Sequence, residues 1–129
     1  MTTGIGHGAL YDKAMMFAIR IVNLYKYLKE EKDEYVMSKQ VLRSGTSIGA
    51  NISEGFGAES RVDFSHKLSI ALKEANETRY WLDLLQATCF ISEQQYDSLE
   101  SDLKEIISLL TASIKTCKTK KNINIENEK

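Results

Sequence analysis

Apolar residues recur along most of this chain at alternating steps of three and four, the spacing that gives an α-helix one buried face. Four such stretches follow one another, and each ends in a short polar or glycine-containing segment. The pattern predicts an all-α protein, an antiparallel up-down four-helix bundle formed by residues 9–118. Residues 1–8 lack the pattern and are expected to form a flexible lead-in, and residues 119–129 a disordered polar tail.

The first predicted helix carries two apolar stripes. One follows the three-and-four spacing from Leu10 to Leu28, and the second widens the buried face, so we expect this helix to meet two neighbours. The charged run of residues 29–34 is predicted to be a solvated turn. The members of the second stripe are Tyr11, Met15, Ala18, Val22 and Tyr25.

The second helix is predicted from about Tyr35 to Phe56, and it contains three of the chain's seven glycines. Gly45 and Gly49 are four residues apart, so they lie on one face, although each interior glycine costs about 1 kcal/mol relative to alanine. We interpret this face as a smooth strip for close packing. Its expected partner is the small middle of the third helix, formed by Ala71, Ala75 and Thr78.

Capping signals separate the remaining helices. Gly55 or Gly57 suits a left-handed cap at the end of the second helix. Ser60 with Asp63 is expected to open the third helix, and Ser92 with Gln95 to open the fourth. Both cysteines fall on apolar faces, so we expect buried, reduced thiols at Cys89 and Cys117.

Composition narrows the choice of function only slightly. The 129 residues carry a net charge of -1, which removes the simplest argument for nucleic-acid binding but allows a local basic patch. No apolar run approaches the roughly 20 residues of a membrane span, and the first residues do not resemble a signal peptide. We therefore expect a cytoplasmic protein that does not associate with a membrane.

The motifs that could indicate catalysis have simpler interpretations. Residues 45–49 match the G-x-S-x-G pattern of a nucleophile elbow, but no strand precedes them, so we interpret the match as accidental. The histidines His7 and His66 have no second ligand at metal-binding spacing, and we expect no metal and no cofactor. Glu74 and Glu77 are expected to pair with cations rather than to form a carboxylate site.

A polar stripe along the second helix has two possible readings. Arg43, Ser47, Asn51 and Glu54 recur at steps of four, four and three. The stripe is either fully solvated, or partly buried with Arg43 paired to a carboxylate such as Glu77 or Glu54 of a neighbouring subunit. The chain's basic cluster also has two readings, a phosphate contact or a solubilising tail. It consists of Lys115, Lys118, Lys120 and Lys121.

Three segments resemble a known family. The motif RSGTSIGANISEG, the aromatic-rich segment of residues 14–24 and the segment FSHKLSIALKEANETRYWL are similar to the small bundle proteins encoded in intervening sequences of bacterial 23S ribosomal RNA genes. The resemblance covers residues 9–115. The family's characteristic polar positions correspond here to Arg43, Ser44, Ser47, Asn51, Glu54 and Glu77.

The resemblance implies a homopentameric ring without catalytic activity and an association with RNA or DNA. It also implies kinship with the accessory variability protein of diversity-generating retroelements, in which a basic surface binds RNA and the reverse transcriptase. The isoelectric point near 6.1 departs from that basic branch. Two hypotheses remain, a protein scaffold without a nucleic-acid role and nucleic-acid binding through a ring face. The contacts expected for the latter are Lys39, Arg43, Lys115, Lys118, Lys120 and Lys121.

Overall fold

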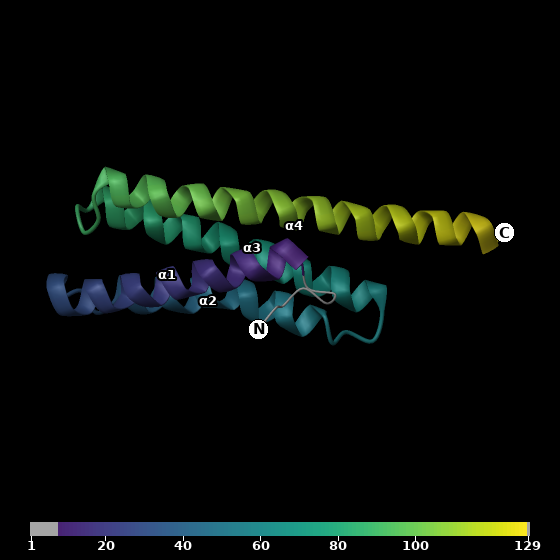
Figure 1. The fold of residues 1–129 in the computed structure, drawn as a ribbon, viewed down its shortest axis with the longest axis horizontal. Helices are drawn as coiled ribbons and strands as arrows, with labels where there is room; N and C mark the ends of the chain where they lie inside the picture. Colours follow the sequence, from purple (N-terminus) through teal and green to yellow (C-terminus); the bar gives the residue numbers. More distant parts are fainter. Residues whose placement is uncertain (1–7, 129) are drawn as a thin grey trace.

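The computed structural model describes the backbone of residues 8–128 and the side chains of residues 8–119. Within these residues the chain forms four helices, α1 (Gly8–Lys32), α2 (Met37–Gly55), α3 (Arg61–Ala87) and α4 (Glu93–Glu128). Helix α1 packs against α2 and α4, and α3 packs against the same two helices, so the four helices surround one core (Figure 1). The predicted all-α four-helix bundle is confirmed.

The core is built from the apolar seams that the spacing predicts. Each helix contributes one buried residue every three or four positions, so side chains from all four helices meet along the bundle axis. Aliphatic residues dominate, with Phe17 as the largest fully buried side chain. The side chains with no exposed surface include Ile21, Leu28, Val41, Ile48, Ile52, Leu68, Leu82, Leu85, Leu103, Ile106 and Leu110.

The second apolar stripe of α1 is only partly buried. Helix α1 does meet two neighbours, as predicted, and Tyr11, Ala18, Val22 and Tyr25 are half-buried. Met15, however, is 46% exposed, so its predicted burial is wrong. The reason is geometric, because the two neighbouring helices cover the face around Phe17 and its flanks but not the opposite side of α1.

The glycine strip of α2 packs against α1, not against α3 as predicted. A Cβ atom placed on Gly45 would lie 2.8 Å from two side-chain carbons of Ile21, and one on Gly49 would lie 3.6 Å from Ala14. The small middle of α3 instead faces Ser44, whose hydroxyl lies 3.0 Å from that of Thr78. A helix in a bundle has two neighbours, and periodicity alone does not say which of them a given flank meets.

Two of the three predicted caps are confirmed. The Ser60 hydroxyl accepts a hydrogen bond of 3.1 Å from the Asp63 backbone N–H, and Ser92 and Gln95 form a reciprocal capping box. The left-handed glycine cap is wrong. Neither Gly55 nor Gly57 has a positive φ, and tight turns close the end of α2 through bonds such as that from the Gly57 N–H to the Glu54 carbonyl (3.0 Å).

The turn between α1 and α2 is less solvated than its charges suggest. Glu34 is only 9% exposed, and its carboxylate accepts backbone hydrogen bonds from Val36 (3.2 Å), Met37 (3.1 Å) and Ser38 (2.7 Å). It therefore satisfies the free N–H groups at the start of α2. Its negative charge also interacts favourably with the positive end of the helix dipole there. The prediction of a solvated turn is wrong for this residue.

The two cysteines differ in exposure. Cys117 is buried as predicted, but Cys89 is exposed, so that part of the prediction is wrong. Cys89 follows the end of α3 with a φ of 67°. Its N–H binds the Gln86 carbonyl (3.0 Å) and the next N–H binds the Leu85 carbonyl (2.9 Å), the Schellman arrangement usually built around glycine. The apolar spacing of α3 continues to residue 89, but its helix stops first.

Helix α4 is the longest element and extends beyond the others (Figure 1). Its 36 residues run to Glu128, so the backbone is helical through most of the segment for which we expected a disordered tail. The sequence offers a reason, since it contains neither proline nor glycine after Gly57. The side chains of Lys120 and Lys121 lie outside the described residues.

Candidate functional site: the polar stripe between α2 and α3

At the Arg43 end of the polar stripe, an ion-pair cluster joins α2 to α3. The Arg43 guanidinium lies 3.5 Å from a carboxylate oxygen of Glu74 and donates a hydrogen bond to Glu77. The side chain of Arg43 remains 52% exposed, whereas that of Glu74 is 19% exposed. Of the two readings of the stripe, the structure shows the paired one, and the carboxylates come from the same subunit.

Glu77 also binds the chain's single tryptophan. The indole Nε1 of Trp81, one helical turn further along α3, donates a 3.0 Å hydrogen bond to the same carboxylate oxygen that Arg43 contacts. These two donors stabilise the charged form, so the pKa of Glu77 is lowered, with the bond from Trp81 as the larger cause. Tyr80 packs edge-on against Trp81, with ring centroids 5.1 Å apart.

The lowered pKa of Glu77 predicts a pH-dependent contribution to stability. The contribution is fully present above the ordinary carboxyl pKa of 4.5 and is lost as the pH falls through the lowered folded-state value. We expect the free energy of unfolding of the parent protein to exceed that of Glu77→Gln by a constant amount at neutral pH, and this difference to shrink in acid.

Tryptophan fluorescence offers a direct measurement, since Trp81 is the only reporter. Its emission should change as Glu77 becomes protonated in the folded protein, and Glu77→Gln should lack that transition. An identical acid transition in both proteins would contradict the assignment. Because both charged side chains are substantially exposed, added salt should weaken the effect.

The rest of the stripe is satisfied by neighbouring groups of the same chain. The Ser47 hydroxyl donates to the Arg43 carbonyl (2.6 Å), and the Asn51 amide donates to the Ser47 carbonyl (2.8 Å). Glu54 pairs with Lys67 of α3 at 2.9 Å, so its carboxylate already has a partner within the subunit. The stripe therefore joins α2 to α3 at its two ends, through Arg43 and Glu54, whereas Ser47 and Asn51 bond within α2.

The geometry around Ser47 differs from that of a nucleophile elbow. Residues 45–49 lie inside α2, whereas the elbow is a sharp turn between a strand and a helix. The hydroxyl of Ser47 is used by a carbonyl of its own helix, and His66 is an exposed residue near the start of α3. Among residues 8–119, no three His, Cys, Asp or Glu side chains gather as a metal site would require.

Among the predicted nucleic-acid contacts whose side chains are described, Lys39 lies far from Lys115 and Lys118. Lys39 lies in the first turn of α2, whereas Lys118 lies beside the start of α3, close to where α2 ends. The length of α2 between those ends is about 24 Å. Arg43 is occupied by its carboxylates. Helix packing does add a cation that the sequence analysis missed, because Arg61 lines the same hollow as Lys118 and His66.

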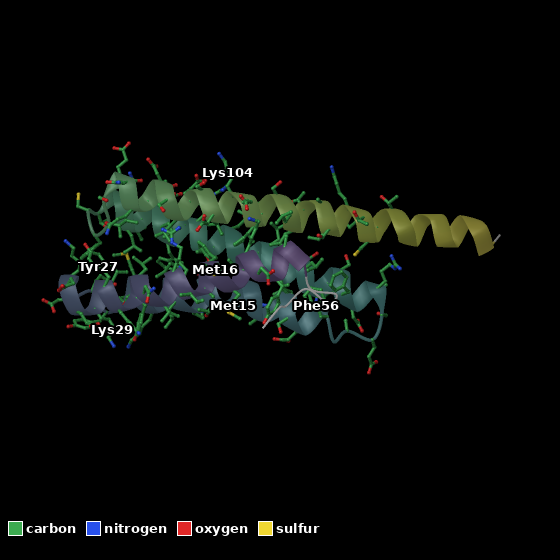
Figure 2. All side chains as sticks on the ribbon, in the orientation of Figure 1. Met15, Met16, Tyr27, Lys29, Phe56 and Lys104 are labelled. Atoms are coloured by element: carbon green, nitrogen blue, oxygen red, sulfur yellow. The ribbon has the colours of Figure 1, made fainter. Side chains whose placement is uncertain are left out.

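An exposed apolar patch on α1 was also missed by the sequence analysis. Met15, Met16 and Ile19 are 46%, 63% and 49% exposed, and they lie on the side of α1 that neither α2 nor α4 covers. Figure 2 shows the two methionines on α1. We call these three residues the α1 patch. The sequence does carry a signal for it, since the apolar residues of α1 exceed those of a helix with one buried face.

The described helices include none that combines the length and apolarity needed to cross a membrane.

Comparison with known proteins identifies one family and finds similar solved structures. The sequence model of the 23S rRNA-intervening sequence proteins matches residues 8–112. A crystal structure from Bacteroides thetaiotaomicron, described as a protein of unknown function from the S23 ribosomal protein family, shares 60% sequence identity with a TM-score of 0.82. The match covers 83% of this chain and 99% of that one. The search of curated proteins gives no match.

Proposed function

The chain belongs to the 23S rRNA-intervening sequence protein family, and from this premise we propose that it is a non-enzymatic, self-assembling helical module. The single observation that carries the proposal is the α1 patch. A stable bundle has no need to leave Met15, Met16 and Ile19 in water on adjacent positions of one helix. Such a cluster is typical of a subunit interface, in which methionine adapts to an apolar partner surface.

The bonding of the polar stripe supports a structural role for it. Its charged groups pair with side chains of α3, and Ser47 and Asn51 bond to backbone carbonyls of α2, so each already has a partner within the subunit. Ser47 in particular has its hydroxyl bonded to a backbone carbonyl, and we expect a serine-reactive probe to leave it unlabelled. The proposed assembly is a homopentameric ring, the state implied by the resemblance of the sequence.

Replacement of Ile19 with glutamate tests the proposal. A charge placed in an apolar interface must lose its hydration. We therefore expect Ile19→Glu to raise the dissociation constant of the assembly at least 10-fold. Analytical ultracentrifugation would measure the mass of the parent protein and the variant. Val62→Glu is the matched control, since Val62 is 56% exposed on α3, outside the patch. Equal masses for the parent protein and Ile19→Glu would contradict the proposed interface.

Nucleic-acid binding is a second candidate, favoured by the cations at one end of the bundle. Lys118 and Arg61 line one hollow, Lys115 is exposed one turn away, and the described residues include no ion-pair partner for these three cations. A ring would repeat the cluster in each subunit and strengthen its attraction for phosphate. A reverse transcriptase, the protein partner implied by the resemblance, belongs to this candidate because its template is RNA.

A salt titration distinguishes this candidate from a scaffold without a nucleic-acid role. Binding of a structured RNA should weaken steeply with salt, and the double variant Lys115→Gln and Lys118→Gln should flatten that slope. The control carries Lys73→Gln and Lys104→Gln, two exposed lysines outside the cluster. If the dissociation constant for RNA changed neither with salt concentration nor in the double variant Lys115→Gln and Lys118→Gln, the cluster would be excluded as the binding surface.

A further inference from the structure

A small basic hollow lies between the first turns of α3 and the part of α4 that runs beside them. Its volume is about 250 Å³, below the roughly 300–1,000 Å³ of pockets that hold drug-sized ligands. The hollow therefore suits one small chemical group and not an extended ligand. Its lining residues are Arg61, Val62, Ser65, His66, Ser69, Cys117 and Lys118.

Three of the lining side chains are basic, and none is acidic. Arg61 and His66 come from α3 and Lys118 comes from α4, so basic groups approach the hollow from two helices. Among the described residues, no carboxylate forms an ion pair with any of the three. Glu59 and Asp63, the acidic residues nearest to Arg61 in the chain, do not line the hollow. The local charge therefore favours an anion.

The helix dipoles add to the positive potential. Arg61 is the first residue of α3, so the hollow adjoins the positive end of that helix. The negative end of α4 lies elsewhere, because α4 continues from Lys118 to Glu128, a length of about 15 Å (Figure 1). A helix that ended at Lys118 would instead present free backbone carbonyls near the hollow.

The hydrogen-bond donors suit a phosphate group. A guanidinium such as that of Arg61 presents parallel N–H groups to two phosphate oxygens, and the ammonium of Lys118 is a compact charge with three donors. The imidazole of His66 carries at least one N–H in either protonation state. The Ser65 hydroxyl has no hydrogen-bond partner among the described residues, whereas that of Ser69 already donates to the Ser65 carbonyl (3.0 Å).

We propose that the basic hollow binds the phosphate group of a phosphate monoester. Such a group carries a charge of about −2 at neutral pH and three free oxygens, which match donors arriving from both helices. A diester has less charge and a second substituent that must also find room in the hollow. The proposal goes beyond self-assembly, because all the lining residues belong to one subunit. It also differs from a contact with the nucleic-acid backbone, because it selects a terminal phosphate.

Titration calorimetry of the full-length protein with glycerol phosphate tests the proposal. We expect it to bind roughly 10-fold more tightly than dimethyl phosphate at the same ionic strength, and Arg61→Gln and Lys118→Gln each to weaken its binding roughly 10-fold. Lys104→Gln removes the same charge from an exposed position of α4 outside the hollow and should leave binding unchanged. Equal affinity for the two esters, or unweakened binding by both hollow variants, would overturn the proposal.

A further pair of variants separates this site from the proposed assembly. Val62→Glu, the assembly control above, places a carboxylate in the lining of the hollow. It should abolish binding of glycerol phosphate and leave the mass of the assembly unchanged. Ile19→Glu should lower that mass and leave the binding unchanged. Retained binding in Val62→Glu, or lost binding in Ile19→Glu, would overturn the proposal whatever the state of assembly.

Two RNA strands of one sequence identify the source of the monoester. One strand ends in a 5′ phosphate and the other in a 5′ hydroxyl. If the phosphorylated strand binds more tightly and Val62→Glu removes that difference, the ligand is the end of a nucleic-acid strand. Equal affinity for the two strands, together with binding of glycerol phosphate, would assign the hollow to a small phosphorylated molecule.

Discussion

Replacing Gly45 with leucine is expected to destabilise the protein by about 2 to 3 kcal/mol. A Cβ at this position would lie 2.8 Å from the Cγ1 and Cγ2 atoms of Ile21. Ile21 is fully buried, so its side chain is surrounded by other atoms and cannot move aside into solvent. The stiff β-branched side chain has few alternative rotamers in a helix. Removing a helical glycine regains about 1 kcal/mol, which is too little to offset the overpacking. Chemical denaturation at fixed protein concentration would measure the change.

The other glycine of the strip supplies the control. At Gly49 an added Cβ would make ordinary contacts of 3.6 Å with Ala14, so Gly49→Ala should stabilise the protein by about 0.5 to 1 kcal/mol. A double variant tests the cause at Gly45. Combining Gly45→Leu with Ile21→Ala should cost less than the sum of the two single changes. Strict additivity would mean that Ile21 is not what excludes a side chain at position 45.

The contrast between the two glycines shows where sequence reasoning about this fold stops. The spacing of apolar residues predicted four helices, their order and most of the core, because burial of one face is repeated over many turns of each helix. The four-residue spacing of Gly45 and Gly49 predicted a close contact, but not its partner. Which flank of α2 meets α1 depends on the arrangement of the helices around the core, and no local pattern encodes it.

The ends of the helices also include features that the sequence predicts and features that it does not. Ser60 and Ser92 cap helices through side chains three residues from their partners, so both caps could be read locally. Cys89 occupies a left-handed position at which the sequence offers no glycine, and its exposure follows from where α3 stops. The apolar spacing extends past that point and therefore misleads.

The candidate site was predictable in its residue types but not in its connections. A line of Arg43, Ser47, Asn51 and Glu54 was visible in the sequence, together with Glu77 as one possible partner. The indole N–H of Trp81 also helps to hold the Glu77 carboxylate, a contact that the sequence pattern did not predict. The basic residues could not be grouped from the sequence, because only the antiparallel packing of α3 and α4 brings Arg61 next to Lys118.

Glu34 was predicted to lie in a solvated turn, but the structure shows it buried against the start of α2. Its replacement is therefore expected to have a large effect on stability. Glu34→Ala should destabilise the protein by about 2 to 3 kcal/mol. Three backbone N–H groups at the start of α2 would lose a charged acceptor, and the Ser38 N–H is buried, so water replaces that bond poorly. The helix dipole would also lose its compensating charge.

The graded variants of Glu34 separate the charge from the hydrogen bonds. Glu34→Gln keeps an acceptor oxygen of nearly the same shape, so its cost should fall between those of the parent protein and Glu34→Ala. Glu31→Ala removes a carboxylate from an exposed position in the same charged run and should change stability by less than about 0.5 kcal/mol. Equal effects of Glu34→Ala and Glu31→Ala in equilibrium unfolding would mean that the turn is solvated after all. A large effect confined to Glu34 would identify one buried carboxylate as the link that fixes where α2 begins.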